Sequence, residues 1–187
     1  MNFLLNILDK RKAKINNMKK KGLRESTILL NYRFGNWVHY RCKILYIKQI
    51  LWFLYKIWYK FLIDFIMGTE IPAETKMGKN VKLEHGGKGV VINPQSIIGS
   101  NVIIYHQVTI GGFGLAHFDE QYINENQKKG GAPIIGNSVI IGTGAKILGP
   151  VKIGDGARVG ANAVVINDVP PDSTAVGVPA KIILNKE

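Results

Sequence analysis

The fold is decided by residues 135–170, which divide into six hexads: IGNSVI, IGTGAK, ILGPVK, IGDGAR, VGANAV and VINDVP. Isoleucine or valine opens every hexad, and alanine or valine fills every fifth position. Helices repeat near 3.6 residues and strands alternate every two, so a period of six is typical of a solenoid whose short strands are joined by tight turns. Each hexad therefore predicts one face of a coil, with its first side chain pointing inward.

The same frame of six continues upstream of this stretch. It is carried by four isoleucines: Ile92, Ile98, Ile104 and Ile110. An insertion at residues 86–88 shifts the frame by three, and the frame breaks again after Ile110. Residues 111–134 are polar and flanked by glycine, so we expect them to leave the solenoid as an excursion loop. A long loop in a tight fold is usually functional.

The charge of the chain is concentrated at one end. Of the net charge of +12, residues 1–66 contribute 14 Lys and Arg against 3 acidic residues, whereas residues 67–187 hold 11 against 10. Such a local basic segment indicates an anionic lipid or an acidic partner rather than nucleic acid. The single cysteine, Cys42, favours a reducing compartment. No signal peptide is apparent, so we expect a cytoplasmic protein.

We expect two domains: a basic and aromatic helical region at 1–67 and the solenoid at 68–187. Within the first, helices are expected at 25–39 and at 43–66, where eight aromatic residues occur. Charged residues and Gln interrupt the second helix too often for a transmembrane span. Two interpretations remain open for 43–66: it packs on the solenoid or a neighbouring subunit, or it lies in the plane of a membrane with lysines at the headgroups.

Two histidines are candidates for a catalytic role because of their positions in the repeat. His85 and His106 are each the third residue of a hexad, and they lie 21 positions apart, which is one coil of three hexads plus the three-residue insertion. They should therefore stack on adjacent coils, about 5 Å apart. A neutral imidazole accepts a hydroxyl proton near neutral pH, so this pair predicts general base catalysis. His39 lies among the expected helices and is interpreted as a packing or surface residue.

The hexads resemble those of the hexapeptide-repeat acyltransferases, which fold as left-handed parallel β-helices, so we expect a mainly β fold of this kind with a short helical extension. Residues 68–92, GTEIPAETKMGKNVKLEHGGKGVVI, and residues 105–114, YHQVTIGGFG, are similar to the serine acetyltransferase branch and its sugar-acetylating relatives. This resemblance implies that His85 is the general base. It also implies that Glu70, 15 positions earlier, orients His85, and that Glu84 contacts the acceptor.

The C-terminal coils resemble the acetyl-CoA site of the wider family. The resemblance implies that Thr143, Ala161 and Lys181 contact CoA, and that a homotrimer forms its active sites between subunits. Backbone N–H groups at Gly111 and Gly112 are expected near the thioester, where they would hold an oxyanion. Acetyl-CoA is then a co-substrate, and no metal is expected.

The acceptor is the least determined part of the resemblance. Serine acetyltransferases carry an Arg-His-Pro motif where this chain has Gly131, Ala132 and Pro133. The YRFGNWVHYR stretch is similar to short relatives linked to bacterial surface polysaccharides. We therefore expect transfer of acetyl to a sugar hydroxyl of a capsular or other surface polysaccharide or its precursor, at the inner face of the membrane. His106 and His117 are then further acceptor-binding candidates.

Two alternatives stay open. One is a serine O-acetyltransferase of cysteine biosynthesis, which serine-dependent release of CoA would support. The other is a metal-dependent hydratase like the γ-class carbonic anhydrases, which need three histidines around zinc. The histidine spacing does not match that family, and the VPPDSTAVGVPAK ending favours CoA.

Overall fold

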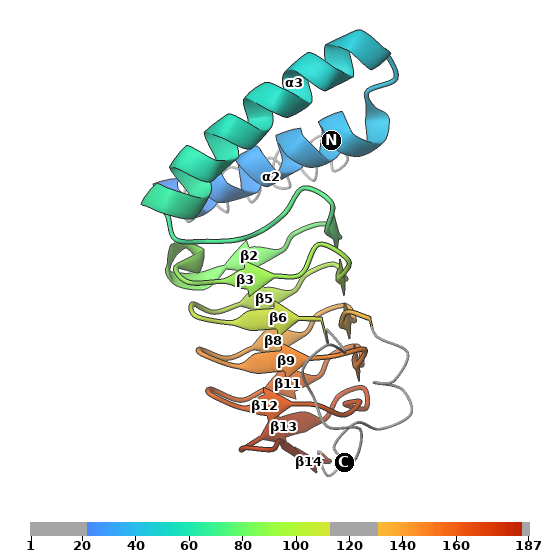
Figure 1. Cartoon of the computed structure of the whole chain (residues 1–187). Coiled ribbons are helices and arrows are strands. Elements are labelled where there is room, and N and C mark those ends of the chain that lie inside the picture. The colour runs from blue at the N-terminus through green and yellow to red at the C-terminus, as the bar shows by residue number, and fades with distance from the viewer. Residues whose placement is uncertain (1–21, 113–130, 185–187) are drawn as a thin grey trace, which may run out of the picture.

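The computed structural model describes residues 22–112 and 131–184. It is mainly β, with two helices lying across one end of a stack of short strands (Figure 1). His117 and most of the expected excursion loop lie outside the described residues.

Both expected helices form. Helix α2 spans Leu23–Arg41, and helix α3 spans Leu45–Trp58 and continues as a π-helix, η1, over Tyr59–Ile66. Helix α2 lies between α3 and the first coil (Figure 1). Its buried side chains include Ile28, Leu29 and Tyr32, and the Tyr32 hydroxyl donates a hydrogen bond to the Thr75 carbonyl at 2.7 Å. In the described part of the chain, no helix combines the length and the apolarity that crossing a bilayer requires.

The solenoid consists of three sheets, to which successive coils add one short strand each. The first sheet contains β1 (Lys76–Met77), β4 (Ile97–Ile98), β7 (Ile134–Ile135) and β10 (Lys152–Ile153). The second contains β2 (Lys82–Leu83), β5 (Ile103–Ile104), β8 (Ile140–Ile141), β11 (Arg158–Val159) and β13 (Thr174–Val176). The third contains β3 (Val91–Ile92), β6 (Thr109–Gly111), β9 (Lys146–Leu148) and β12 (Val164–Val165). These strands pair in parallel, whereas β14 (Lys181–Ile183) is antiparallel to β13.

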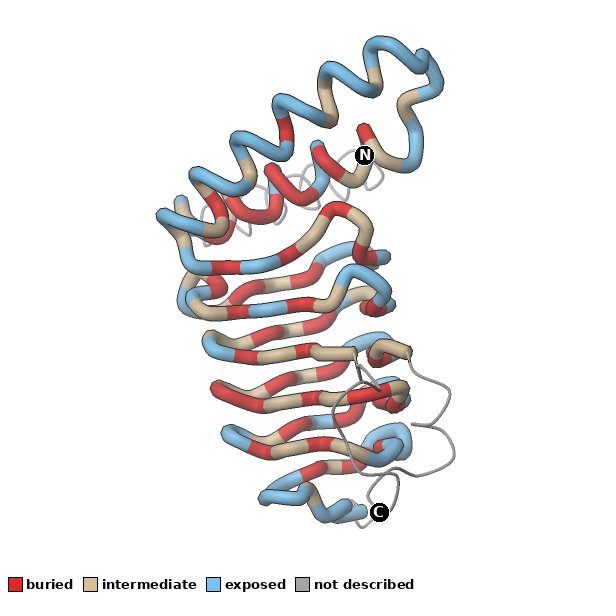
Figure 2. Tube along the Cα trace, viewed as in Figure 1, coloured by how far each residue is buried: buried red, intermediate tan, exposed pale blue. Residues whose placement is uncertain are grey.

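The hexad prediction of the core is confirmed. The side chains that open the hexads from Ile135 to Val165 are at most 2% exposed, and those at the fifth positions are at most 4% exposed. They form one cluster along the stack, and Figure 2 shows buried residues recurring on every coil. Glycine follows the aliphatic residue in four of the six hexads because neighbouring coils approach closely: a Cβ on Gly142 would lie 2.7 Å from the backbone nitrogen of Ala161.

The repeat frame returns where the sequence predicts it. Strand β6 includes Gly111, which pairs with Leu148, and β7 begins at Ile134. The described strands on either side therefore reach one residue into the expected loop, 111–134, at each end. Ile134 and Ile135 pair with Ile97 and Ile98 on the preceding coil.

Candidate active site

Strand register gathers four of the predicted site residues at one corner of the solenoid. In the second sheet, four residues of successive coils are aligned: Leu83, Ile104, Ile141 and Val159. The residues two positions further along the chain therefore form a column, which we call the corner column: His85, His106, Thr143 and Ala161. Candidate catalytic and CoA-binding side chains, which are up to 76 positions apart in the sequence, thus follow one another along a single edge.

The two histidines of the corner column are in contact. Their ring centroids are 4.9 Å apart with planes at 84°, an edge-to-face arrangement. The stacking expected from their 21-residue separation is therefore confirmed. The hydroxyl of Thr143 lies 3.5 Å from Nδ1 of His106, which is at the outer limit of a hydrogen bond. His85 is exposed, so a substrate can reach its ring.

His85 lies in an unusual turn. After β2 the chain turns tightly over Glu84–Gly87, where His85 has φ 53° and Gly86 has φ 67°. Left-handed backbone is uncommon for residues other than glycine, although histidine is among those that adopt it more often. A turn of this kind persists only when its surroundings hold it in place.

Helix α2 provides that support. The Glu25 carboxylate, 4% exposed, accepts a hydrogen bond from the Leu83 N–H at 3.0 Å. The Arg24 guanidinium donates to the Gly86 carbonyl at 3.1 Å and also to the Met67 carbonyl. Arg24 and Glu25 thus hold the turn on both sides of His85. Neither residue was predicted from the sequence, since only tertiary packing brings them here, although an acid within so basic a segment indicates a specific contact.

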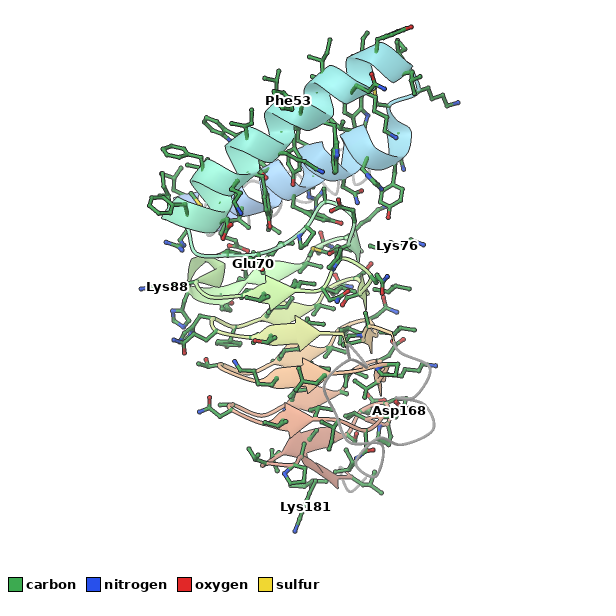
Figure 3. The ribbon with its side chains drawn as sticks, in the orientation of Figure 1. Phe53, Glu70, Lys76, Lys88, Asp168 and Lys181 are labelled. Carbon is green, nitrogen blue, oxygen red and sulfur yellow. The ribbon has the colours of Figure 1, made fainter. Side chains whose placement is uncertain are left out.

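The backbone of Glu70 lies near the same corner. Its N–H donates to the Val90 carbonyl at 2.8 Å, and the Gly89 N–H donates to the Gly68 carbonyl at 2.9 Å. The segment before Glu70 therefore runs beside the end of the His85 turn, at the junction of helices and solenoid (Figure 3). Within the described residues, however, the Glu70 side chain forms no hydrogen bond with His85.

The Glu84 side chain forms a hydrogen-bonded ion pair with Lys82. The hydrogen bond to the Glu84 carboxylate raises the pKa of the Lys82 ammonium above its usual value. The pair is partly exposed, with the Lys82 side chain 45% and the Glu84 side chain 28% accessible. The Glu84 carboxylate is therefore held beside His85, but Lys82 partly neutralises its charge.

The other predicted cofactor residues are more spread out. Lys181 begins β14 at the far end of the stack, where its side chain points away from the protein (Figure 3). From β2, which precedes His85, to β14 the second sheet counts five strand steps, or about 24 Å at strand spacing. Gly111 ends β6, five residues beyond His106, so Gly111 and Gly112 lie across a sheet face from the corner column of the same chain. Among the described residues, no group of three or more His, Cys, Asp or Glu side chains is placed to hold a metal ion.

Comparison with known proteins gives consistent results. Residues 132–167 match the model of the family described as bacterial transferase hexapeptide (six repeats). A serine acetyltransferase of Helicobacter pylori strain J99 is 41% identical over 155 residues, which are 83% of this chain and 78% of that protein.

Solved structures agree with the relatives. Soybean serine acetyltransferase, as apoenzyme, aligns with a TM-score of 0.62 at 35% identity, over 82% of this chain and 56% of that one. A serine acetyltransferase in complex with CoA aligns with a TM-score of 0.65 at 29% identity, over 87% of this chain and 57% of that one. The chain thus spans somewhat more than half the length of these two solved proteins.

Proposed function

The chain belongs to the serine acetyltransferase family, and we propose that it transfers acetyl from acetyl-CoA to the hydroxyl of free serine. The observation that carries this proposal is the corner column, in which His85 and His106 contact each other and lie in line with Thr143. One edge of the solenoid thereby offers a base for the acceptor and a path for the cofactor.

Family membership decides between the expectations of the sequence analysis. The prediction of an O-acetyltransferase that uses acetyl-CoA is confirmed. The prediction of a polysaccharide acceptor is wrong, because the relatives and the structural neighbours are serine acetyltransferases. This chain also matches most of the length of the Helicobacter pylori enzyme. The same finding excludes the alternative of a metal-dependent hydratase.

In the proposed reaction His85 removes the proton from the serine hydroxyl as its oxygen attacks the thioester carbonyl of acetyl-CoA. The C–S bond breaks, acetyl passes to oxygen, and CoA leaves as a thiol after taking up the proton. General base catalysis of this kind contributes about 10²- to 10⁴-fold. Holding both substrates in one site supplies much of the remainder by removing the entropy of encounter.

We assign the acceptor contacts around the turn that carries His85. Glu84 lies beside His85 and is proposed to contact the serine ammonium group, with Lys82 released or shared as the ligand binds. Glu70 is proposed to orient His85, because the hydroxyl of the neighbouring Thr69 donates a hydrogen bond to the Gly87 carbonyl at the end of that turn. His106, which touches His85, is proposed to contact the acceptor as well. His117 lies outside the described residues and keeps only its proposed acceptor role.

We assign the cofactor to the lower coils of the corner column. Thr143 and Ala161 would line the pantetheine arm, and Lys181 would meet a phosphate group as a point charge. Gly111 and Gly112 lie away from this edge in their own chain, so their proposed contact with the thioester requires a neighbouring subunit. A left-handed solenoid assembled as a trimer, as the family resemblance implies, would bring such an edge close.

The experiment follows release of the CoA thiol from acetyl-CoA with serine as acceptor. Wild type and His39→Ala should release CoA only when serine is present, since His39 contacts Tyr40 and Trp52 in the helices rather than the corner column. His85→Ala should lose at least 100-fold in rate while acetyl-CoA affinity is retained. Full activity in His85→Ala, or no serine dependence in the wild type, would overturn the proposal.

A further inference from the structure

Helix α3 and its continuation η1 present an apolar face that no described residue covers. Only Tyr55 and Ile63 of these two elements are buried. Figure 2 shows exposed residues along the outer side of the helix, and in Figure 3 Phe53 points away from the rest of the protein. The large exposed side chains are Leu45, Tyr46, Ile47, Ile50, Phe53, Leu54, Ile57, Trp58, Phe61, Phe65 and Ile66. Monomeric proteins rarely leave so many apolar groups side by side in water without a use.

The opposite side of the same helix is firmly packed. Tyr55 stacks on Trp52 at 5.3 Å between ring centroids, and it lies so close to Gly35 of α2 that a Cβ there would clash with its ring. Ile63 joins the core of the solenoid. The helix is thus held in place by its inner side, and the packing interpretation of residues 43–66 describes that side alone. The outer face requires a separate explanation.

The charges of this outer face are mostly positive. Phe53, Phe61 and Phe65 line a hollow of about 780 Å³ together with Lys56 and Lys60. Asp64 also lines it, at 3.7 Å from the Lys60 ammonium in a largely exposed pair. Lys56 lies over the ring of Trp52, 5.4 Å from its centroid. An apolar strip with lysines beside it and exposed Trp and Tyr is the pattern of helices that lie in the membrane interface.

We propose that α3 and η1 dock this enzyme in the plane of a bilayer that contains anionic lipid. Within the part of the chain that the structure describes, the helix forms the outermost layer at one end, so a flat surface can approach it along its length (Figure 1). A second copy fits less well, because a two-fold contact through the same face would bring Lys56 and Lys60 of both chains together. Anionic headgroups neutralise these lysines while the aromatic side chains enter the boundary of the acyl chains. Residues 1–66, with their 14 basic residues against 3 acidic ones, add attraction of the same sign.

The test measures co-sedimentation of the full chain with vesicles of phosphatidylcholine, either pure or containing one quarter phosphatidylglycerol. The wild type should bind the anionic vesicles, bind the neutral ones at least ten-fold more weakly, and lose affinity as salt is raised. The double variant Phe53→Asp and Phe61→Asp changes two side chains that are 66% and 60% exposed, so the fold should persist. It should lose at least 100-fold in affinity and keep its serine-dependent CoA release in solution.

A matched control carries the same change in charge elsewhere. Leu30→Asp with Leu184→Asp replaces two side chains that are 67% and 69% exposed, one on α2 and one after β14, and should bind vesicles within three-fold of the wild type. Size-exclusion chromatography with light scattering is run on all three proteins. Absence of vesicle binding, or equal binding to both lipid mixtures at every salt concentration, would overturn the proposal. A smaller assembly only in the Phe53→Asp and Phe61→Asp variant, without lipid binding in the wild type, would assign the face to a second copy instead.

Discussion

Replacing Glu25 with alanine tests whether α2 is part of the catalytic apparatus. The Glu25 carboxylate accepts the Leu83 N–H at 3.0 Å from a position that is 4% exposed. A hydrogen bond to a charged group contributes about 1.5 to 3 kcal/mol, and a buried N–H left without a partner costs about 1 to 3 kcal/mol. These are two descriptions of one lost contact, so we expect Glu25→Ala to lower the free energy of unfolding by about 2 to 3 kcal/mol.

Glu25→Ala should also slow catalysis, because the Glu25 contact supports the turn that carries His85. His85 has left-handed backbone, and without Glu25 only Arg24 of α2 holds that turn by a hydrogen bond, at the Gly86 carbonyl. A shift of about 1 Å in a catalytic group can cost about 100-fold in rate. We expect kcat/KM for serine to fall at least ten-fold at a temperature where the variant is folded, while acetyl-CoA affinity stays the same.

Urea denaturation and CoA-release kinetics are measured on three variants. Glu25→Gln keeps an acceptor oxygen, so it should lose about 1 kcal/mol or less and retain most activity. Glu74→Ala removes a partly buried acid of the first coil, which accepts a hydrogen bond from the Tyr40 hydroxyl through its backbone carbonyl, and should resemble the wild type. Full activity in Glu25→Ala would refute the positioning role, as would an equal loss in Glu25→Gln and Glu25→Ala.

Three further outcomes follow from local geometry. Gly86→Ala should lose about 1 to 2 kcal/mol in urea denaturation, because its φ is 67° and a Cβ there would lie 2.6 Å from Arg24 Cδ; an unchanged midpoint would contradict this. Gly142→Ala should lose about 1 to 3 kcal/mol, because the new methyl meets the backbone of the next coil, whereas Gly22→Ala, which faces open space, should not. Burial raises the pKa of Tyr32 to about 12 from 10.0, so the folded state resists its ionisation and stability should decline from pH 10 toward pH 12. Tyr32→Phe should weaken that decline, as measured by denaturation at stepped pH, and an identical pH profile would exclude Tyr32 as its source.

The repeat was predictable because each hexad meets only its neighbours. A strict period fixes which side chains point inward, and it also fixes the register between coils. That is why the contact between His85 and His106 followed from counting, even across the inserted residues. The same register places Thr143 and Ala161 on this edge, although the sequence analysis assigned them to CoA through the family resemblance alone.

Contacts between the extension and the solenoid were not predictable in this way. No period relates α2 to the turn at His85, so the hydrogen bonds of Arg24 and Glu25 come from packing alone. The orientation of Glu70 and the ion pair of Glu84 depend on side-chain rotamers, which spacing does not determine. The acceptor was mispredicted because the missing Arg-His-Pro motif was given more weight than the similarity of the remaining coils.

The antiparallel strand β14 has a consequence for solubility. A stack of parallel coils has open strands at both ends, and each end is a template on which another molecule can add and extend a fibre. Helix α2 blocks one end, and at the other β14 turns back along β13 and occupies its hydrogen-bonding groups. Deleting the chain from Lys181 onward should therefore leave the corner column intact but expose the edge of β13, so that two molecules can pair through their C-terminal ends while α2 still prevents growth of a fibre.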